Sequence, residues 1–372
     1  MLKQYPFYVK STIILLGLIL LVYTLVNLGD ILIPLSFALL IAILLNPIVN
    51  RFEKWKIPRV WAISFALFIA FLFFAGVGYF LSAQIAGFSD QAPLMKKKII
   101  SLVEKLQQDI STRFNIDVKK QQQAMEEAGA NIKPLIGSTA GTLMSSIAAL
   151  VLLPVYSFLF LYYKTLLLSF FYEVFAEENS KEVSVVLKQT KGAVQSYMFG
   201  LLVEASIVAV LNSVALLILG VKYWILLGVI GAILNILPYI GGIIAIALPV
   251  LIATVTKDGF HTQLLIIACY LVIQFIDNHF LVPYIVSSKV KINALISIVF
   301  VLLGNAAWGV SGMFLSIPFA GILKIIFDRI DDLKPWGRLL GDEIPSRPRG
   351  QWPKIRKRKP AIAIVKANDK TA

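Results

Sequence analysis

Breaks within otherwise apolar sequence are the feature that most constrains this chain. Four of them interrupt nearly continuous apolar runs in its C-terminal third, at 234–238 (LNILP), 239–242 (YIGG), 277–283 (DNHFLVP) and 309–318 (GVSGMFLSIP). In hydrocarbon, an unpartnered carbonyl or an ionised carboxylate is costly unless protein or a water-filled cavity satisfies it. Any one break fits a solute pathway as well as a kink that helps helices pack, because glycine and proline are common in membrane helices. Several breaks together favour a pathway.

The composition is that of an integral membrane protein. The 372 residues are 58% hydrophobic, with a mean hydropathy of +0.80, whereas soluble domains are about half apolar. Runs long enough to cross a hydrocarbon core of about 30 Å, which takes about 20 residues, begin near residue 12. Lys3 and Lys10 precede the first run, and no small-residue cleavage site follows it. We therefore expect 12–28 to be a retained span rather than a cleaved signal peptide.

Charge and cysteine usage exclude several classes of function. The net charge is +14, but the basic residues lie in short loops and a tail, which predicts membrane orientation rather than nucleic-acid binding. The single Cys269 excludes an intrachain disulfide, and with only His261 and His279 beside it we expect no metal site and no cofactor. The sequence also has no phosphate-binding loop, nucleophile elbow or HExxH helix, so we expect neither an enzyme nor an ATP-driven pump.

The predicted fold is all-α and polytopic, with about eight membrane segments. Residues 1–83 hold three transmembrane helices, at 12–28, 31–49 and 60–83, and we expect the first two to form a tight hairpin. The loop after the second helix, 50–59, is basic and should lie in the cytoplasm under the positive-inside rule. By the same count both termini are cytoplasmic. Its basic residues are Arg51, Lys54, Lys56 and Arg59, against the single acid Glu53.

The polar parts of the chain lie in the middle and at the end. Residues 84–140 are predicted to be amphipathic helix outside the membrane, because apolar residues recur at helical spacing within 84–137. Residues 141–330 form the C-terminal transmembrane region that would carry transport. Residues 331–372 are predicted to be a basic, disordered cytoplasmic tail, whose commonest role is to hold topology and which could also contact anionic lipid.

Two apolar stretches are too long for single spans. The stretch 223–255 is about 33 residues, or roughly 50 Å as one helix, and is broken by Pro238 and by Gly241 and Gly242. The stretch 292–327 repeats the pattern, with breaks at Trp308, Gly309, Gly312 and Pro318. Each is predicted to be two half-length helices in a re-entrant hairpin. Two hairpins leave six spans and two full crossings give eight, and the lysines Lys289 and Lys291 slightly favour hairpins because that model puts their loop in the cytoplasm.

Two carboxylates at membrane depth are the candidate coupling groups. Glu204 is in mid-span, on the helical face that also carries Tyr197 and Gly200. Asp277 is predicted to share a face with Tyr270, Gln274 and Tyr284. An ionisable residue at this depth is a functional hypothesis by default. The alternatives are a hydrogen-bonded structural Glu204 and an Asp277 near the interface that pairs with Lys289 or Lys291.

Around these acids we expect a polar pathway made of amide side chains and broken backbone. The ends of half-helices leave N–H groups free for anionic or hydroxylated cargo and carbonyls free for cations, and glycines let the backbone approach closely. The bland alternative for the glycines is hairpin packing without a ligand. The predicted pathway residues are Asn235, Pro238, Tyr239, Gly241, Gly242, Gln274, Asn278, Asn305, Gly309 and Gly312.

Three motifs in fixed order resemble the AI-2E family of bacterial membrane transporters. They are 235–249 (NILPYIGGIIAIALP), 274–283 (QFIDNHFLVP) and 301–318 (VLLGNAAWGVSGMFLSIP), and the resemblance extends over essentially the whole chain. One departure is the Gly304-Asn305 pair, where the family often has two glycines. This leaves open whether the helices approach closely at that point.

The resemblance implies transport without choosing the cargo. Members of the family have been associated with export of the furanone autoinducer-2, and others with exchange of sodium or lithium for protons. The expected protein is a multi-pass transporter of the bacterial inner membrane, and a homo-oligomer such as a pentamer would be in keeping with the family. Its expected partners are the lipid bilayer and either a small polar solute or Na+ and H+. The alternative is a membrane-anchored interaction or scaffold protein, which would not need breaks at membrane depth.

Overall fold

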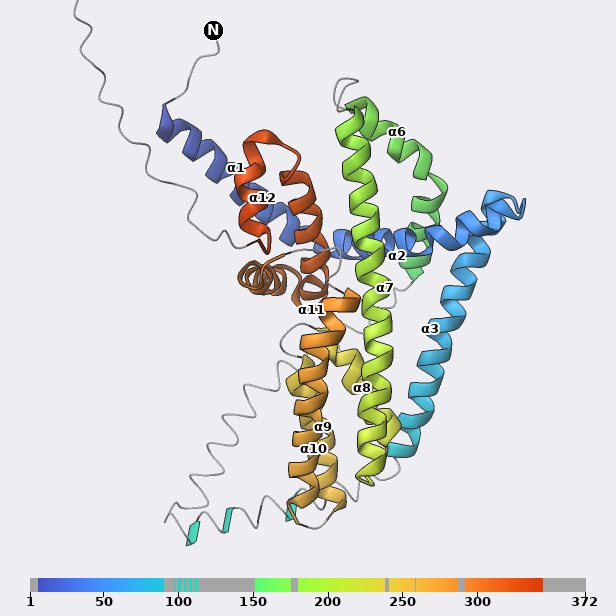
Figure 1. The fold of residues 1–372 in the computed structure, drawn as a ribbon, viewed down its shortest axis with the longest axis vertical. Coiled ribbons are helices and arrows are strands. Elements are labelled where there is room, and N and C mark those ends of the chain that lie inside the picture. Colours follow the sequence, from blue (N-terminus) through green and yellow to red (C-terminus); the bar gives the residue numbers. More distant parts are fainter. Residues whose placement is uncertain are drawn as a thin grey trace, which may run out of the picture.

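The computed structural model is helical throughout the parts of the chain that it describes, in agreement with the predicted all-α fold (Figure 1). These parts are 6–89, isolated positions between 97 and 112, 151–174, 180–237, 241–257, 259–286 and 292–343. The predictions for Pro238, Tyr239, Lys289, Lys291 and for most of 84–140 lie outside the described residues. The same holds for the basic tail after residue 343.

Several helices are long and apolar enough to cross a membrane. Within the described ranges there are five, and a sixth if the bent pair Val151–Tyr162 and α6 (Lys164–Val174), which meet at 62°, forms one span. The chain is therefore a multi-pass membrane protein. The five are α2 (Gly29–Lys54), α3 (Arg59–Ser89), α7 (Ser180–Ile218), α10 (His261–Ile276) continued by the π-helix η2 (Asp277–Val286), and α11 (Ala294–Phe327).

The first two helices bend instead of forming the predicted tight hairpin. Helix α1 (Phe7–Asn27) ends one residue before α2 begins, and helical hydrogen bonds run through the junction, from Leu28 N to Thr24 O and from Leu32 N to Leu28 O. A chain that keeps these bonds cannot reverse its direction. Gly29 is used for packing, since a Cβ there would lie 3.3 Å from the Trp308 ring.

The stretch 223–255 forms two half-length helices in a hairpin, as predicted. Helices α8 (Trp224–Asn235) and α9 (Gly241–Thr256) have 12 and 16 residues, or roughly 18 and 24 Å, each shorter than a core of about 30 Å. They run side by side, because a Cβ on Gly231 would lie 3.5 Å from that of Ala245 and a Cβ on Gly241 would collide with the Leu234 carbonyl oxygen. Glycine at 241 is thus required by the close approach of the two helices.

Helix α11 is a candidate span by length and composition alone, because it folds back on itself as two shorter helices. Trp308 and Gly309 leave the helical conformation, and Gly309 has φ +58° and ψ −140°, which favours glycine. On either side of this turn, Gly304 and Gly312 lie with their backbones in direct contact. The close approach that the Gly304-Asn305 departure left open is therefore present. The turn is anchored to the α1–α2 bend by a 2.9 Å hydrogen bond from Trp308 Nε1 to Leu25 O.

Helix α7 packs against α2, α6, α8, α10, η2 and α11 (Figure 1). Gly200 meets η2, where a Cβ would lie 2.6 Å from Ile285 O, and Ser213 lies against Gly228 of α8. Near the C-terminal end of α7, an apolar core joins this helix to α8, α9 and α10 around Leu216, Ile252 and Ile266. Helix α7 is thus held between the α8–α9 hairpin and η2.

Helical structure continues beyond the point where we predicted the tail to begin. A 3-10 turn, η3 (Asp331–Leu333), leads into α12 (Lys334–Leu340), which packs on α11 with Leu340 buried. The side chain of Asn293 fastens this region, because its Nδ2 donates to the carbonyl oxygens of Leu339 and Gly341 at 2.6 and 3.0 Å.

The glycine contact within α11 gives a stability prediction. A methyl group at Gly304 or Gly312 would push two helix backbones apart, and we expect Gly304→Ala and Gly312→Ala each to lower stability by about 1–3 kcal/mol, the usual cost of overpacking. Gly76→Ala in α3 is the matched control, because nothing lies within 4 Å of its Cβ position. Thermal unfolding in detergent measures the difference. Equal midpoints for all three variants would contradict the hairpin contact.

Candidate functional site

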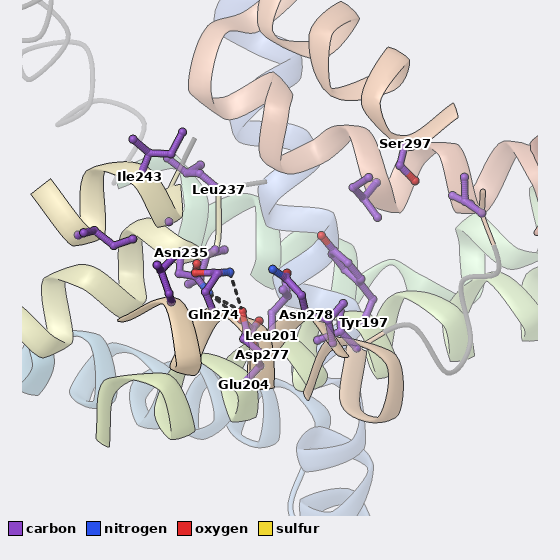
Figure 2. A pocket seen from close by; sticks show the side chains of 18 residues that line it. Tyr197, Leu201, Glu204, Asn235, Leu237, Ile243, Gln274, Asp277, Asn278 and Ser297 are labelled. Carbon is purple, nitrogen blue, oxygen red and sulfur yellow. Dashed lines mark hydrogen bonds between the residues drawn. The ribbon is translucent and has the colours of Figure 1, made fainter. Parts of the chain in front are cut away.

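Two carboxyl groups from different helices meet inside the helix bundle (Figure 2). Glu204 of α7 and Asp277 lie side by side and share one donor, the side-chain amide of Asn235. Asn235 Nδ2 donates to Glu204 Oε1 at 3.3 Å and to Asp277 Oδ2 at 2.8 Å. Gln274 Nε2 donates to the same Asp277 oxygen at 3.4 Å. The acids are only 3% and 2% exposed, so they are held in the protein interior.

The local sequence explains why these side chains meet. Glu204 belongs to the buried stripe of α7 that also holds Leu201 and Val208, at spacings of three and four residues. Asp277 is the first residue of η2, directly after α10 ends at Ile276, and π-helical turns are frequent at functional sites. Asn235 is the last residue of α8, at the tip of the re-entrant hairpin. The buried face of α7, the α10–η2 junction and the C-terminal end of α8 therefore meet at one point.

A cavity of about 680 Å³ lies against the acid pair. Its polar wall includes Glu204, Asp277, Asn235 and Gln274, and the rest is mostly apolar. No lysine, arginine or histidine from the described parts of the chain lines it. The remaining lining residues are Tyr197, Leu201, Ile236, Leu237, Gly242, Ile243, Ile246, Leu271, Asn278, Val282, Val286, Ile292, Ser297 and Ile317.

The structure brings together some of the predicted pathway residues. Gly242 and Asn278 line the cavity, and a Cβ on Gly242 would lie 2.9 Å from Gln274 Oε1 and 3.5 Å from Asn235 Oδ1. Gly241 lies next to them but contacts the backbone of α8.

The other predicted pathway residues lie apart from the cavity. Gly309 and Gly312 form and pack the turn of α11, and Asn305 is exposed on that helix. None of the three lines the cavity.

The predicted polar stripe around Asp277 is correct on one side only. Tyr270 is buried at 4% exposure, on the same face as Asp277. Tyr284, expected on this face at seven residues after Asp277, is 78% exposed. The reason is that η2 is a π-helix, whose hydrogen bonds run from i to i+5, so the seven-residue spacing of an α-helix no longer returns to the same face.

Much of the cavity wall was not predicted from the sequence. The missed residues are mainly apolar, such as Leu201, Ile246, Leu271 and Ile317. In a chain with so many apolar residues, nothing in the sequence distinguishes a cavity wall from a lipid-facing surface. Ser297, from the first turns of α11, is the polar residue on the wall that we did not single out.

Among the described residues, the acid pair has no charged partner of opposite sign. Two ionised carboxylates in contact repel each other, and such pairs are stable when they share a proton or hold a cation. Asn235 and Gln274 supply hydrogen bonds but no charge, and the second oxygen of Asp277, Oδ1, has no hydrogen-bond partner within the described part of the chain. The arrangement is therefore suited to taking up and releasing a proton or a small cation.

Comparison with known proteins identifies the relatives of this chain. Residues 12–332 match the family model described as AI-2E family transporter. The AI-2 transport protein TqsA of Escherichia coli K12 is 25% identical over 319 residues, which cover 85% of this chain and 91% of TqsA. The proposed transport protein YueF of Bacillus subtilis is 24% identical, over 79% of this chain and 82% of its own length. These relatives are named for transport, not for catalysis.

Loss of the shared amide should destabilise the acid pair. We expect Asn235→Ala to lower the free energy of unfolding by about 1.5–3 kcal/mol, the range for hydrogen bonds to charged groups. Because the hydrogen bond that is lost joins Asn235 to Asp277, Asn235→Ala should destabilise the Asp277→Asn variant less than it destabilises the wild type. Thermal unfolding in detergent measures both, with the exposed Asn305→Ala as control. Additive effects of the two substitutions would contradict the shared hydrogen bond.

Proposed function

Because the chain belongs to the AI-2E family of transporters, we propose that it is a secondary transporter that exchanges a small polar organic solute for protons. The observation that carries this proposal is the buried pair Glu204 and Asp277, without a cationic side chain, on the wall of the cavity. A group that gains and loses a proton beside the solute is what coupling to a proton gradient requires.

The size and lining of the cavity support an organic solute rather than a bare ion. Binding sites for small molecules usually have volumes of about 300–1,000 Å³, with mostly apolar walls and a few polar groups that fix orientation. The cavity, at about 680 Å³, is within this range. Its carboxyl and amide groups suit hydroxyl and carbonyl groups of the cargo. Autoinducer-2 is the first solute to test, since one relative is named as an AI-2 transport protein.

Asn235 connects the proton to a movement of the chain. It lies at the tip of the α8–α9 hairpin, whereas the acids belong to α7 and to the α10–η2 junction. Its amide stabilises the pair best while the carboxyl groups carry negative charge. Protonation of the acids weakens these hydrogen bonds and frees the hairpin tip to move. In this mechanism the protonation state selects the side of the membrane to which the cavity opens.

Exchange of sodium or lithium for protons is the second candidate. Monovalent and other hard cations bind oxygen ligands, and four residues of the polar wall carry side-chain oxygens: Glu204, Asn235, Gln274 and Asp277. A cation between the carboxyl groups would replace the shared proton. The same acids would then couple the two flows.

The wider setting follows from the same family. We propose a location in the bacterial inner membrane, with both termini in the cytoplasm, and a homo-oligomeric assembly such as a pentamer. A membrane-anchored scaffold is the competing interpretation. It gives no reason for an acid pair beside a cavity, and a scaffold that depends on its tail would lose its partner on deletion of 344–372, whereas a transporter would keep its flux.

Neutral variants of the acids test the proposal. In proteoliposomes loaded with autoinducer-2 and a pH-sensitive dye, we expect release of the solute to be accompanied by proton entry. Glu204→Gln and Asp277→Asn should each abolish proton entry, because neither amide can exchange a proton. Asp277→Asn should still exchange external for internal autoinducer-2, a process that needs no net proton movement.

The controls are acids that lie away from the cavity. Glu182→Gln, on an exposed position of α7, and Asp30→Asn, on an exposed position of α2, should behave like the wild type. Addition of sodium, lithium or potassium in place of the solute tests the second candidate. Normal proton entry with the Glu204→Gln, Asp277→Asn double variant would exclude the acids as coupling groups.

A further inference from the structure

A row of buried polar side chains continues from the acid pair along α10. Asp277, Tyr270 and Gln263 follow one another at seven-residue intervals, so they lie on one face of the helix, with about 10 Å between successive positions. Tyr270 is 4% and Gln263 6% exposed. Three atoms of this row, Asp277 Oδ1, Tyr270 OH and Gln263 Oε1, find no hydrogen-bond partner among the residues that the structure describes. Gln263 Nε2 points to Thr254 of α9, at 3.5 Å from its Oγ1.

Helix α7 contributes a parallel observation. Asn212 lies on the same buried stripe as Glu204, two turns further along, and is 2% exposed. Its Nδ2 lies 3.3 Å from the position that a Cβ on Gly231 of α8 would take, and its Oδ1 has no hydrogen-bond partner within the described ranges. Thus each of the two helices that carry an acid also carries a buried, incompletely bonded polar side chain about two turns away, in the layer that holds the apolar core of α7–α10.

This row and the solute cavity share the acid pair but have different lining. The cavity extends along α10 as far as Leu271, and its other walls include Tyr197 and Leu201 of α7 and Val282 and Val286 of η2, whereas Tyr270, Gln263 and Asn212 do not line it. The row lies after Glu204 on α7 and before Asp277 on α10. It ends at Gln263, in the first turn of α10, close to the exposed connection between α9 and α10. Figure 1 shows this connection at the end of the bundle where α7 also ends.

We propose that Tyr270, Asn212 and Gln263 form a proton route that joins the acid pair to the protein surface at the α9–α10 connection, separate from the cavity that takes the solute. The inference rests on the proposed proton coupling. Water molecules held by the unpartnered oxygens complete the route. The amide oxygens of Asn212 and Gln263 accept the hydrogen bonds that hold the water molecules and carry no proton themselves. The proton passes from one water molecule to the next and through the Tyr270 hydroxyl, which gains one proton as it gives up another, and the last proton is added to Asp277 Oδ1. The net result is the movement of one proton, with no charge left in the row.

The missing hydrogen-bond partners distinguish this row from ordinary core packing. Buried polar groups are nearly always hydrogen-bonded, and an unpaired one destabilises the fold. Two neighbouring helices, α7 and α10, with three such oxygens among the described residues between the acids and one end of the bundle are therefore unexpected in a purely structural core. Buried water that bonds to two or more of these groups removes that cost. Tyr270 alone has a hydroxyl that can both donate and accept in such a chain.

Substitutions in the row should slow proton movement without slowing solute exchange. In the vesicles described above, we expect Tyr270→Phe and Asn212→Leu to lower the initial rate of proton entry driven by autoinducer-2 release by about tenfold. The exchange of external for internal autoinducer-2 should stay at the wild-type rate. Asn212→Ser, which leaves room for water and keeps a hydroxyl, should retain most of the proton entry. Tyr284→Phe, an exposed tyrosine off the row, is the matched control.

The outcomes separate this route from the proposed function. Wild-type proton entry in Tyr270→Phe and Asn212→Leu, with none in Asp277→Asn, would overturn the route and leave the proposed coupling intact. A fall of proton entry and solute exchange to the same extent would show a structural effect and would also overturn it. If the wild-type protein releases autoinducer-2 without proton entry, the proposed coupling fails and the route fails with it.

Discussion

The hydrogen bonds of one side-chain amide link the two buried acids of this protein. Asn235 Nδ2 donates to carboxyl oxygens of both Glu204 and Asp277. Two buried acids in contact can be kept in a protein interior only if donors, protons or cations offset their repulsion and their loss of water. The donor comes from a third element, α8, which ends at Asn235 in the middle of the bundle. The breaks at the end of α8 and at Asp277 make this meeting of three elements possible.

Asn235 reaches the acid pair from the end of a helix and not from the middle of a continuous one. Helix α8 ends at this residue, and the chain returns through α9 directly beside it, which requires glycine at 241 because the Leu234 carbonyl oxygen occupies the space of a Cβ. The change to π-helix at Asp277 has the same consequence on the other side, since it turns the following residues of η2 toward the cavity and α7. Both breaks thus help to bring the side chains of Asn235 and Asp277 together inside the bundle.

The amino-acid pattern predicts the polar half of this site and misses the apolar half. Glu204, Asp277, Asn235 and Gln274 are visible because polar residues are rare and costly in apolar sequence. The length of 223–255 against the membrane thickness predicts the hairpin. The cavity wall is invisible, because an apolar residue facing a cavity has the same sequence signal as one facing lipid.

Errors in the local predictions arise where backbone geometry departs from a regular α-helix. Tyr284 was placed beside Asp277 by α-helical periodicity that η2 does not follow. The Gly29-Asp30 pair was taken as a reversal, although the bonds around Leu28 keep the chain helical. Asn305 was placed in the pathway as a neutral hydrogen-bond donor and acceptor beside the broken backbone, yet it is exposed on α11 and does not line the cavity, and Gly304 before it makes the contact within α11.

The two hairpins contribute different parts of the site although both are broken by glycines. Both are closed by glycine against backbone, but the α8–α9 hairpin carries Asn235 to the acids, whereas α11 contributes Ile317 and Ser297 to the cavity wall and anchors its turn to the α1–α2 bend through Trp308. A movement of the first hairpin would change the hydrogen bonds of the acid pair. A movement of the second would change the wall of the cavity without touching those bonds. In the proposed mechanism, coupling between solute and proton would therefore depend on α7, which contacts both hairpins and carries Glu204.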